Sequence, residues 1–205
     1  VNMILDGEYD VIADINEDDT VDILDIVTLV NWIMNGVPDT YEIAFVLCEG
    51  NFQGNNASLH TLNNDAFTTI TGDTGVSSAI YNNKILVVNN GSSNVHKYNI
   101  TIDGIIEYES TVDLNGSSPR EILIVDDKAY ISQLNVNGIA VIDLQSFTLN
   151  STIIVDGATE GLAFNGTNLF AAIAYDDFST WTTGNSVVKI NLTTNTVETT
   201  YTVNT

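Results

Sequence analysis

The sequence predicts a mainly β protein in which repeated four-stranded units follow a short helical segment. Three observations support this prediction. The hydrophobic period changes from helical to strand-like near Val37–Thr40. Beyond that point, turn dipeptides such as Asn115-Gly116 and Asn137-Gly138 separate short β-rich segments. These segments recur in units of about 40 residues. We therefore place a helical domain at residues 1–38 and a β domain at residues 39–205.

The predicted helix covers Ile23–Met34, with the sequence ILDIVTLVNWIM. Its apolar residues fall at positions 23, 26, 27, 30, 33 and 34, which is the spacing of one helix face. Asn35-Gly36 and Pro38 follow as stop signals. VNMILDG at residues 1–7 matches VNWIMNG at residues 30–36, so the helical domain contains the end of one repeat and a complete second repeat.

An acidic loop before this helix is a candidate calcium site. Ca²⁺ takes about six to eight oxygen ligands, and oxygen-bearing residues alternate along the loop. Counted from the first residue, the candidate ligands occupy loop positions 1, 3, 5, 7, 9 and 12: Asp14, Asn16, Asp18, Thr20, Asp22 and Asp25. Position 6 is Asp19 where Gly is usual, and Asp tolerates the positive φ needed there.

The alternative interpretation of this loop is a solvated acidic helix start, which the helix dipole favours. It explains Asp22 and Asp25 but not the alternation at Asp14, Asn16 and Asp18. We therefore favour Ca²⁺ as the cofactor of this segment.

The β domain contains four repeating units, of which the first is partial. Asn99, Asp143 and Asn191 occupy equivalent positions, 44 and 48 residues apart, and the last unit has an insertion around Asp177–Gly184. In the third unit we expect strands at 121–125, 128–134, 138–144 and 150–155. Four-stranded units of about 40 residues are typical of β-propeller blades.

The order of the strands predicts an incomplete ring of about four blades. The first unit begins at what is the second strand of the other units, and the last unit ends with its outermost strand at 196–203. No strand remains to complete the first unit. We therefore expect either a fragment of a longer protein or an arc that another chain completes by adding a strand to the open blade edge.

The charge balance limits the possible partners. The chain has 5 Lys+Arg and 27 Asp+Glu, with a formal net charge of -22. Nucleic acids and anionic membrane surfaces require clustered Lys and Arg, so we expect neither as a partner. We also expect no membrane insertion, because no apolar run approaches the length of about 18 residues that spans a bilayer. An acidic, Lys-poor surface is typical of secreted or salt-exposed proteins.

Reactive side chains form no catalytic pattern, and we expect no enzymatic activity. His60 and His96 share one repeat position, where later units have Ala140 and Val188, which indicates a strand position. Cys48 is the single cysteine, and we expect it to be a small core residue of an apolar strand. Serine-hydrolase, metalloprotease and phosphate-loop motifs do not occur.

Two other places are candidate ligand sites. Arg120 is a rare cation at the start of the third unit, where it is expected to pair with a carboxylate of a neighbouring blade or to mark a channel-facing site. Asp176, Asp177 and Trp181 lie on the insertion, where an exposed Trp beside carboxylates is a candidate sugar site.

Seven N-x-[ST] sequons are candidate glycosylation sites: Asn56, Asn90, Asn99, Asn115, Asn150, Asn165 and Asn191.

Residues 13–34, together with the tail VNMIL at 1–5, resemble dockerin repeats. These are paired EF-hand-like modules of bacterial secreted and surface proteins. The resemblance spans about residues 1–36 and implies calcium binding, because Asp at loop position 12 is usual in this family. Dockerins bind cohesin modules through a helix that begins at positions matching Ile23 and Leu24. Here that helix is apolar and lacks Lys and Arg, so cellulosomal cohesin binding is not implied.

The β domain resembles YncE-like, YVTN-type repeat propellers of bacterial surface and secreted proteins. The resemblance is carried by VLCEGNFQGNNASLHTLN at 46–63 and SSPREILIVDDKAYIS at 117–132, and it covers about 42–205. It implies a role in binding or surface architecture.

Together these features predict a non-enzymatic bacterial protein that is secreted or located at the cell surface. A calcium-stabilised dockerin-like module precedes propeller blades that act in binding, adhesion or assembly into a surface filament or layer. One alternative is a carbohydrate-binding component of a polysaccharide-degrading complex, with a glycan or a cohesin-like module as partner. Another is part of a propeller hydrolase whose catalytic residues lie outside this chain.

Overall fold

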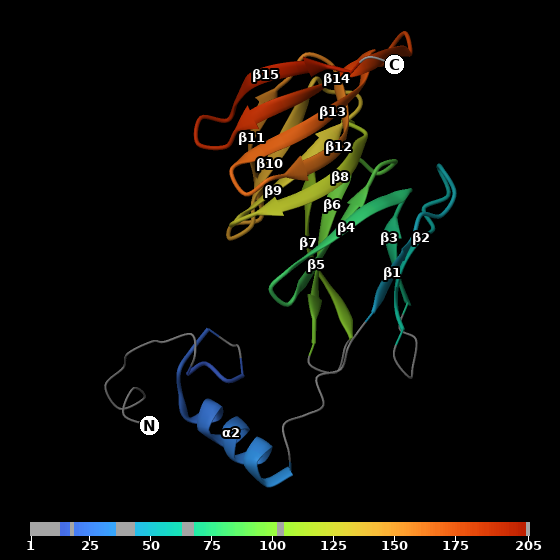
Figure 1. Ribbon diagram of the computed structural model, residues 1–205. Helices are drawn as coiled ribbons and strands as arrows, with labels where there is room; N and C mark the ends of the chain where they lie inside the picture. Colours follow the sequence, from blue (N-terminus) through green and yellow to red (C-terminus); the bar gives the residue numbers. More distant parts are fainter. Residues whose placement is uncertain (1–12, 17–18, 36–43, 63–67, 102–104, 204–205) are drawn as a thin grey trace. The chain divides into compact units, whose positions relative to one another are not determined.

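The computed structural model describes residues 13–16, 19–35, 44–62, 68–101 and 105–203. The chain divides into two compact units, Val1–Glu42 and Ile43–Thr205. In the first unit, helix α2 spans Ile23–Asn35, which confirms the predicted helix (Figure 1). Within the described part, no helix is both long and apolar enough to cross a membrane. The predicted repeat at 1–7 and the candidate ligand Asp18 lie outside the described residues.

The second unit consists of four antiparallel sheets, each built from strands that are consecutive in the sequence. The first sheet has three strands, β1 (Phe45–Cys48), β2 (Ala57–Thr61) and β3 (Thr68–Gly72). The second contains β4 (Gly75–Tyr81), β5 (Lys84–Asn89), β6 (Asn94–Ile100) and β7 (Ile106–Asp113). The third contains β8 (Pro119–Val125), β9 (Lys128–Gln133), β10 (Gly138–Asp143) and β11 (Thr148–Ile154). The fourth contains β12 (Ala158–Phe164), β13 (Asn168–Asp177), β14 (Thr182–Asn191) and β15 (Thr196–Thr202).

The mainly β prediction and the four-stranded units are therefore confirmed. Strands in the middle of the second and third sheets are buried on both faces. In β5 the five residues Ile85–Asn89 are all buried, and in β9 the same holds for Ala129–Gln133. Continuous burial along a strand requires a covering layer on each side of the sheet. The covering layers here are the preceding and following sheets.

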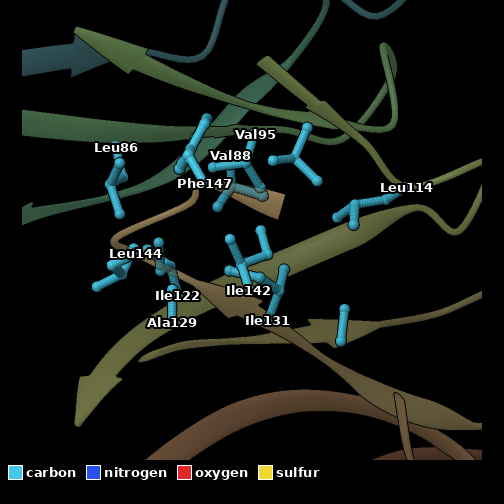
Figure 2. Close-up of a cluster of buried hydrophobic side chains, with 12 residues drawn as sticks. Leu86, Val88, Val95, Leu114, Ile122, Ala129, Ile131, Ile142, Leu144 and Phe147 are labelled. Atoms are coloured by element: carbon cyan, nitrogen blue, oxygen red, sulfur yellow. The ribbon is translucent and has the colours of Figure 1, made fainter. Parts of the chain in front are cut away.

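An apolar cluster lies between each pair of consecutive sheets. Figure 2 shows the cluster between the second and third sheets, which includes Leu86, Val88, Ile122, Ile131 and Ile142. Leu59, Ile85, Val87, Tyr98 and Ile106 lie between the first and second sheets. Tyr130, Ile139, Ile153, Leu169 and Ile190 belong to the cluster between the third and fourth sheets. The second and third sheets, which are buried on both faces, thus each contribute to two clusters.

The first strands of successive sheets lie next to one another, with β8 between β4 and β12 (Figure 1). The second strand of one sheet also contacts the first strand of the next, as β5 contacts β8 and β9 contacts β12. β1 contacts β4 in the same way. β1 therefore occupies the second-strand position, and no described strand fills the first position of the first sheet. This confirms the strand order predicted for the first repeating unit of the β domain, which begins at a second strand.

The repeated Asn or Asp position caps a turn in the third and fourth sheets. Asp143 Oδ1 accepts a hydrogen bond from the Ser146 N–H at 2.8 Å, and Asn191 Oδ1 accepts one from the Thr193 N–H at 2.8 Å. Such side chains replace missing backbone partners in turns. In the second sheet, Asn99 Oδ1 instead accepts a hydrogen bond from Lys84 Nζ at 3.0 Å.

Truncation of a side chain between two sheets should destabilise the protein far more than truncation of an exposed one. Ile131 is fully buried between the second and third sheets, whereas Ile80 on β4 is 60% exposed. We expect Ile131→Ala to lower the unfolding free energy by about 3 kcal/mol and Ile80→Ala by less than about 1 kcal/mol. Urea unfolding would measure both values, and equal losses would contradict this packing.

Glu109 on β7 should contribute to acid sensitivity. Burial disfavours its ionised form, but hydrogen bonds from Lys97 and Lys84 outweigh burial and hold the pKa of Glu109 below its usual value of 4.5. Because the folded-state pKa is lowered, this stabilisation is present above about pH 4.5 and is lost as pH falls through the folded pKa. We expect Glu109→Gln to reduce the fall in Tm on acidification. Glu107→Gln on the same strand is the control, because it removes one carboxylate and leaves the ion pairs of Glu109 with Lys84 and Lys97 in place.

Candidate functional sites

Two buried carboxylates close the described part of the acidic loop. Asp14 Oδ2 accepts a hydrogen bond from the Asp19 N–H at 2.9 Å. Asp25 accepts hydrogen bonds from three backbone N–H groups, those of Ile15 at 2.7 Å, Asn16 at 3.2 Å and Asp22 at 2.7 Å. The bond from the Asp22 N–H contributes most to a pKa of Asp25 below its usual value, because it stabilises the ionised form.

Asp22 and Asp25 also form the start of helix α2. Asp22 Oδ1 accepts a hydrogen bond from the Leu24 N–H at 2.7 Å, and the Asp22 N–H donates to Asp25 Oδ2. Asp22 therefore caps the helix through the N–H of the second helical position, and Asp25 at the third helical position bonds back to the Asp22 N–H. The acidic helix-start interpretation therefore describes the contacts of these two residues in the structure.

The loop meets some requirements of a calcium site. Asp19 at position 6 has a φ of 65°, the left-handed conformation that Gly usually provides there. The candidate donors are all oxygen atoms, which suit Ca²⁺. Among the described residues, no three His, Cys, Asp or Glu side chains are grouped to hold a metal ion. Donor chemistry and backbone conformation thus fit Ca²⁺, while Asp22 and Asp25 make their described contacts with backbone N–H groups.

Arg120 pairs with a carboxylate of the next sheet, as one of the two predictions for it stated. Its Nε and Nη2 atoms donate to Glu160 Oε1 at 3.0 and 2.6 Å, which joins β8 to β12. The two side chains are 32% and 43% exposed, so their pairing stabilises the fold by no more than about 1 kcal/mol.

Arg120 also lines two neighbouring hollows beside the first strands of the sheets. One has a volume of about 400 Å³ and includes Glu49 and Ser77 in its lining. The other has a volume of about 260 Å³ and includes Ser77, Glu121 and Glu160. Arg120 thus joins two sheets and also contributes to a polar concave surface.

The two histidines occupy strands, as the repeat alignment predicted. His60 Nε2 lies 2.8 Å from Ser58 Oγ on β2, and His96 Nδ1 lies 3.1 Å from Tyr98 Oη on β6. Burial lowers the pKa of His96 and raises the pKa of Tyr98 to about 12. Both His96 and Tyr98 are therefore held in their neutral forms near neutral pH.

The prediction that Cys48 is a core residue is wrong, because its side chain is exposed. Val46 lies on the same face of β1 and is 39% exposed. In the next three sheets the corresponding residues, Val87, Ile131 and Ala171, are each 0% exposed. These four residues correspond because each pairs with the residue at the shared repeat position on the following strand. The partners are His60, His96, Ala140 and Val188. This face carries Val46 and Cys48 on β1 and their partners His60 and Ser58 on β2, and no described sheet covers it.

The fourth sheet also has an uncovered face. Phe170, Ala172 and Val187 are only partly buried there. The corresponding residues of the second sheet, Leu86, Val88 and Val95, are fully buried against the third sheet. Both terminal sheets thus carry one face with exposed or partly buried apolar residues among polar ones, and that face lacks a neighbouring sheet within the described residues.

The sequons differ in their accessibility. Asn56, Asn115, Asn150 and Asn165 are exposed. Asn90, Asn99 and Asn191 are partly buried, and their side chains take part in hydrogen bonds with other residues. The exposed group provides the more accessible glycosylation candidates. The candidate ligand residues Asp176 and Trp181 of the insertion are also exposed.

No protein-family model and no curated protein matches the sequence. Several solved structures match the fold of the chain. Hydrazine synthase from Kuenenia stuttgartiensis is 18% identical with a TM-score of 0.60, over 71% of this chain and 43% of that chain. Streptogramin B lyase is 19% identical with a TM-score of 0.57, over 82% and 57% of the respective chains.

A functionally unknown protein from Desulfotomaculum acetoxidans matches at 17% identity and a TM-score of 0.58, over 78% of this chain and 51% of that chain. The chain therefore spans about half the length of these solved structures. At such identities the likeness concerns the fold alone. These neighbours are β-propeller-like, and the four sheets of this chain are consistent with propeller blades.

Proposed function

We propose that this protein is a non-enzymatic assembly protein of the bacterial cell surface or exterior. Its blades associate head to tail, so that the uncovered face of the fourth sheet in one copy packs on the uncovered face of the first sheet in the next. Such a heterologous interface builds a ring where the rotation closes and a filament where it does not. The surface filament or layer expected from the sequence is an assembly of this kind.

The observation that carries this proposal is the exposure of Val46. It is 39% exposed at a repeat position where the next three sheets have 0% exposure. The two terminal faces carry apolar residues at repeat positions that pack together inside the same chain, for example Val46 on the first sheet and Phe170 and Ala172 on the fourth. Burial of such a face would contribute about 25 cal/mol of favourable free energy for each Å² of apolar surface removed from water.

Strand addition strengthens the same contact. β1 is an edge strand, and no described strand pairs with its second edge, so the backbone N–H and C=O groups there can pair with an added strand. A strand donated there occupies the position that β4, β8 and β12 hold in the other sheets. The exposed thiol of Cys48 lies at the end of β1, so its rate of alkylation can be used to detect whether this edge is covered.

Calcium has a structural role in this proposal. Asp14, Asn16, Asp18, Thr20 and Asp22, with Asp25, would hold Ca²⁺ through oxygen atoms and fix the loop before helix α2. The support is the left-handed Asp19 at position 6 and the burial of Asp14 and Asp25, which are 8% and 2% exposed. A dockerin-like module of this type stabilises the first unit and performs no catalysis.

Sedimentation velocity tests the assembly. We expect the wild-type sedimentation coefficient to rise with protein concentration, and Val46→Lys to remain monomeric because it places a charge in the contact. Ile80→Lys is the matched control, since Ile80 is 60% exposed on β4 and lies outside the proposed contact. We also expect alkylation of Cys48 to slow as the assembly forms. A wild-type protein that stays monomeric at high concentration would contradict the proposal.

Calorimetric titration tests the metal site. We expect saturable uptake of about one Ca²⁺ per chain and a higher Tm, both reversed by a chelator. Asp14→Ala should remove this uptake while leaving the Asp22 and Asp25 helix cap in place. Asp113→Ala on β7 removes one negative charge elsewhere and should bind Ca²⁺ as the wild type does. Equal uptake by the two variants would show that the acidic surface, rather than the loop, binds the ion.

A further inference from the structure

The hairpin between β13 and β14 extends beyond the neighbouring blade. Each of these strands has 10 residues, whereas β9 and β10 have 6 residues each. Tyr175 pairs with Thr183 and Asp177 with Thr182, so the extension continues the ladder. A Cβ atom at Gly184 would lie 2.3 Å from the Ile173 carbonyl oxygen. Gly184 therefore permits a close backbone approach at the base of the extension.

Three aromatic rings pack together at the tip of this hairpin. The ring centroid of Trp181 lies 5.6 Å from that of Tyr175 and 4.9 Å from that of Phe178. The Tyr175 and Phe178 rings are 5.3 Å apart. These contacts hold the indole in place, yet Trp181 remains 66% exposed. The rings are too close together to admit a ligand between them, so a ligand must contact the outer surface of the indole.

Trp181 has an unfavourable backbone conformation for a bulky residue. Its φ is 56°, in the left-handed region that Gly or Asn usually occupies. Phe147 also has a positive φ, 48°, but it is 7% exposed and packs in the cluster between the second and third sheets. Core packing therefore offsets the strain at Phe147, whereas Trp181 gains little burial. Strain without a matching gain in packing is typical of functional positions.

The polar groups at the tip favour a cation over a sugar. Ser179 donates to Asp177 Oδ1 through its N–H and Oγ at 2.9 and 2.6 Å, and Thr180 Oγ1 lies 2.9 Å from Thr182 Oγ1. These hydroxyl groups already have partners within the hairpin. The carboxylate of Asp176 is exposed and has no ion pair or hydrogen bond with another described residue. The tip therefore carries the exposed carboxylates of Asp176 and Asp177 in the same hairpin as the exposed indole of Trp181.

We propose that the outer face of Trp181, with the carboxylates of Asp176 and Asp177, binds an Arg or Lys side chain from an exposed basic segment of another protein. A cation within about 6 Å of an indole centroid is attracted by the ring quadrupole, and adjacent carboxylates add to this attraction. The net charge of -22 further increases the local concentration of cationic segments. This site lies at the tip of the β13–β14 hairpin, and the proposal for it does not depend on the head-to-tail contact.

A second copy of this chain is a poor source of the cation. The sequence contains only five Lys and Arg residues. Four of them, Lys84, Lys97, Arg120 and Lys189, form salt bridges within the chain. The partner is therefore a different, basic protein.

Fluorescence titration tests this site. A Trp32→Phe background leaves Trp181 as the single Trp of the chain. The probe is a capped hexa-arginine peptide, and we expect it to quench Trp181 saturably, with affinity that falls as salt rises. Asp176→Asn should weaken binding severalfold. Titration with cellohexaose forms the saccharide arm, and saturable binding of cellohexaose without binding of the peptide would overturn the proposal.

Trp181→Gly separates binding from folding. Calorimetry measures peptide binding to this variant, because it has no indole at position 181 whose fluorescence could be followed. Gly accepts a φ of 56°, so we expect an unchanged or higher Tm together with at least a tenfold weaker affinity for the peptide. Phe52→Ala is the matched control, because Phe52 is a 70% exposed aromatic residue in the first sheet's connecting loop. Equal peptide affinity in Trp181→Gly and Phe52→Ala would show attraction by net charge alone and would overturn the proposal.

Discussion

Burial of apolar side chains between consecutive sheets is the interaction on which the structure of the second unit depends. Each sheet is a meander that holds its own backbone hydrogen bonds, but its two apolar faces need neighbours. The three clusters supply these neighbours for the second and third sheets, where β5 and β9 are buried along five consecutive residues. The long-range order of the unit therefore comes mainly from side-chain packing. Hydrogen bonds between sheets, such as those from Arg120 to Glu160 and from the Leu162 N–H to Glu121, add to it.

The same constraint accounts for the properties of the terminal sheets. A face with the sequence of an internal face remains uncovered when no sheet lies beside it, as the exposure of Val46 and Cys48 illustrates. The chain also carries a formal net charge of -22, and like charge repels. Repulsion between acidic surfaces opposes association, so salt or divalent cations should favour the head-to-tail contact. The proposed assembly should therefore depend on ionic conditions through the acidic composition of the chain.

Much of the fold could be predicted from the sequence, because repeats and turn residues act locally. The strands expected at 121–125 and 128–134 are observed as Pro119–Val125 and Lys128–Gln133, and Asp143 caps the turn that the repeat alignment emphasised. Cys48 was mispredicted because an apolar strand pattern does not reveal whether a second sheet covers it. The capping role of Asp22 and Asp25 overlaps with the calcium pattern, since both use carboxylates at the same spacing. The strain at Trp181 has no sequence signal other than a bulky residue in an inserted turn.

Hydrogen–deuterium exchange of the β1 amides, measured as a function of protein concentration, tests the central claim most directly. If the uncovered face and free edge of β1 form the contact, exchange at Phe45–Cys48 should slow with rising concentration. The amides of β9, already covered on both faces, should show the same slow exchange at every concentration. Fast exchange of the β1 amides that does not change with concentration would contradict the account.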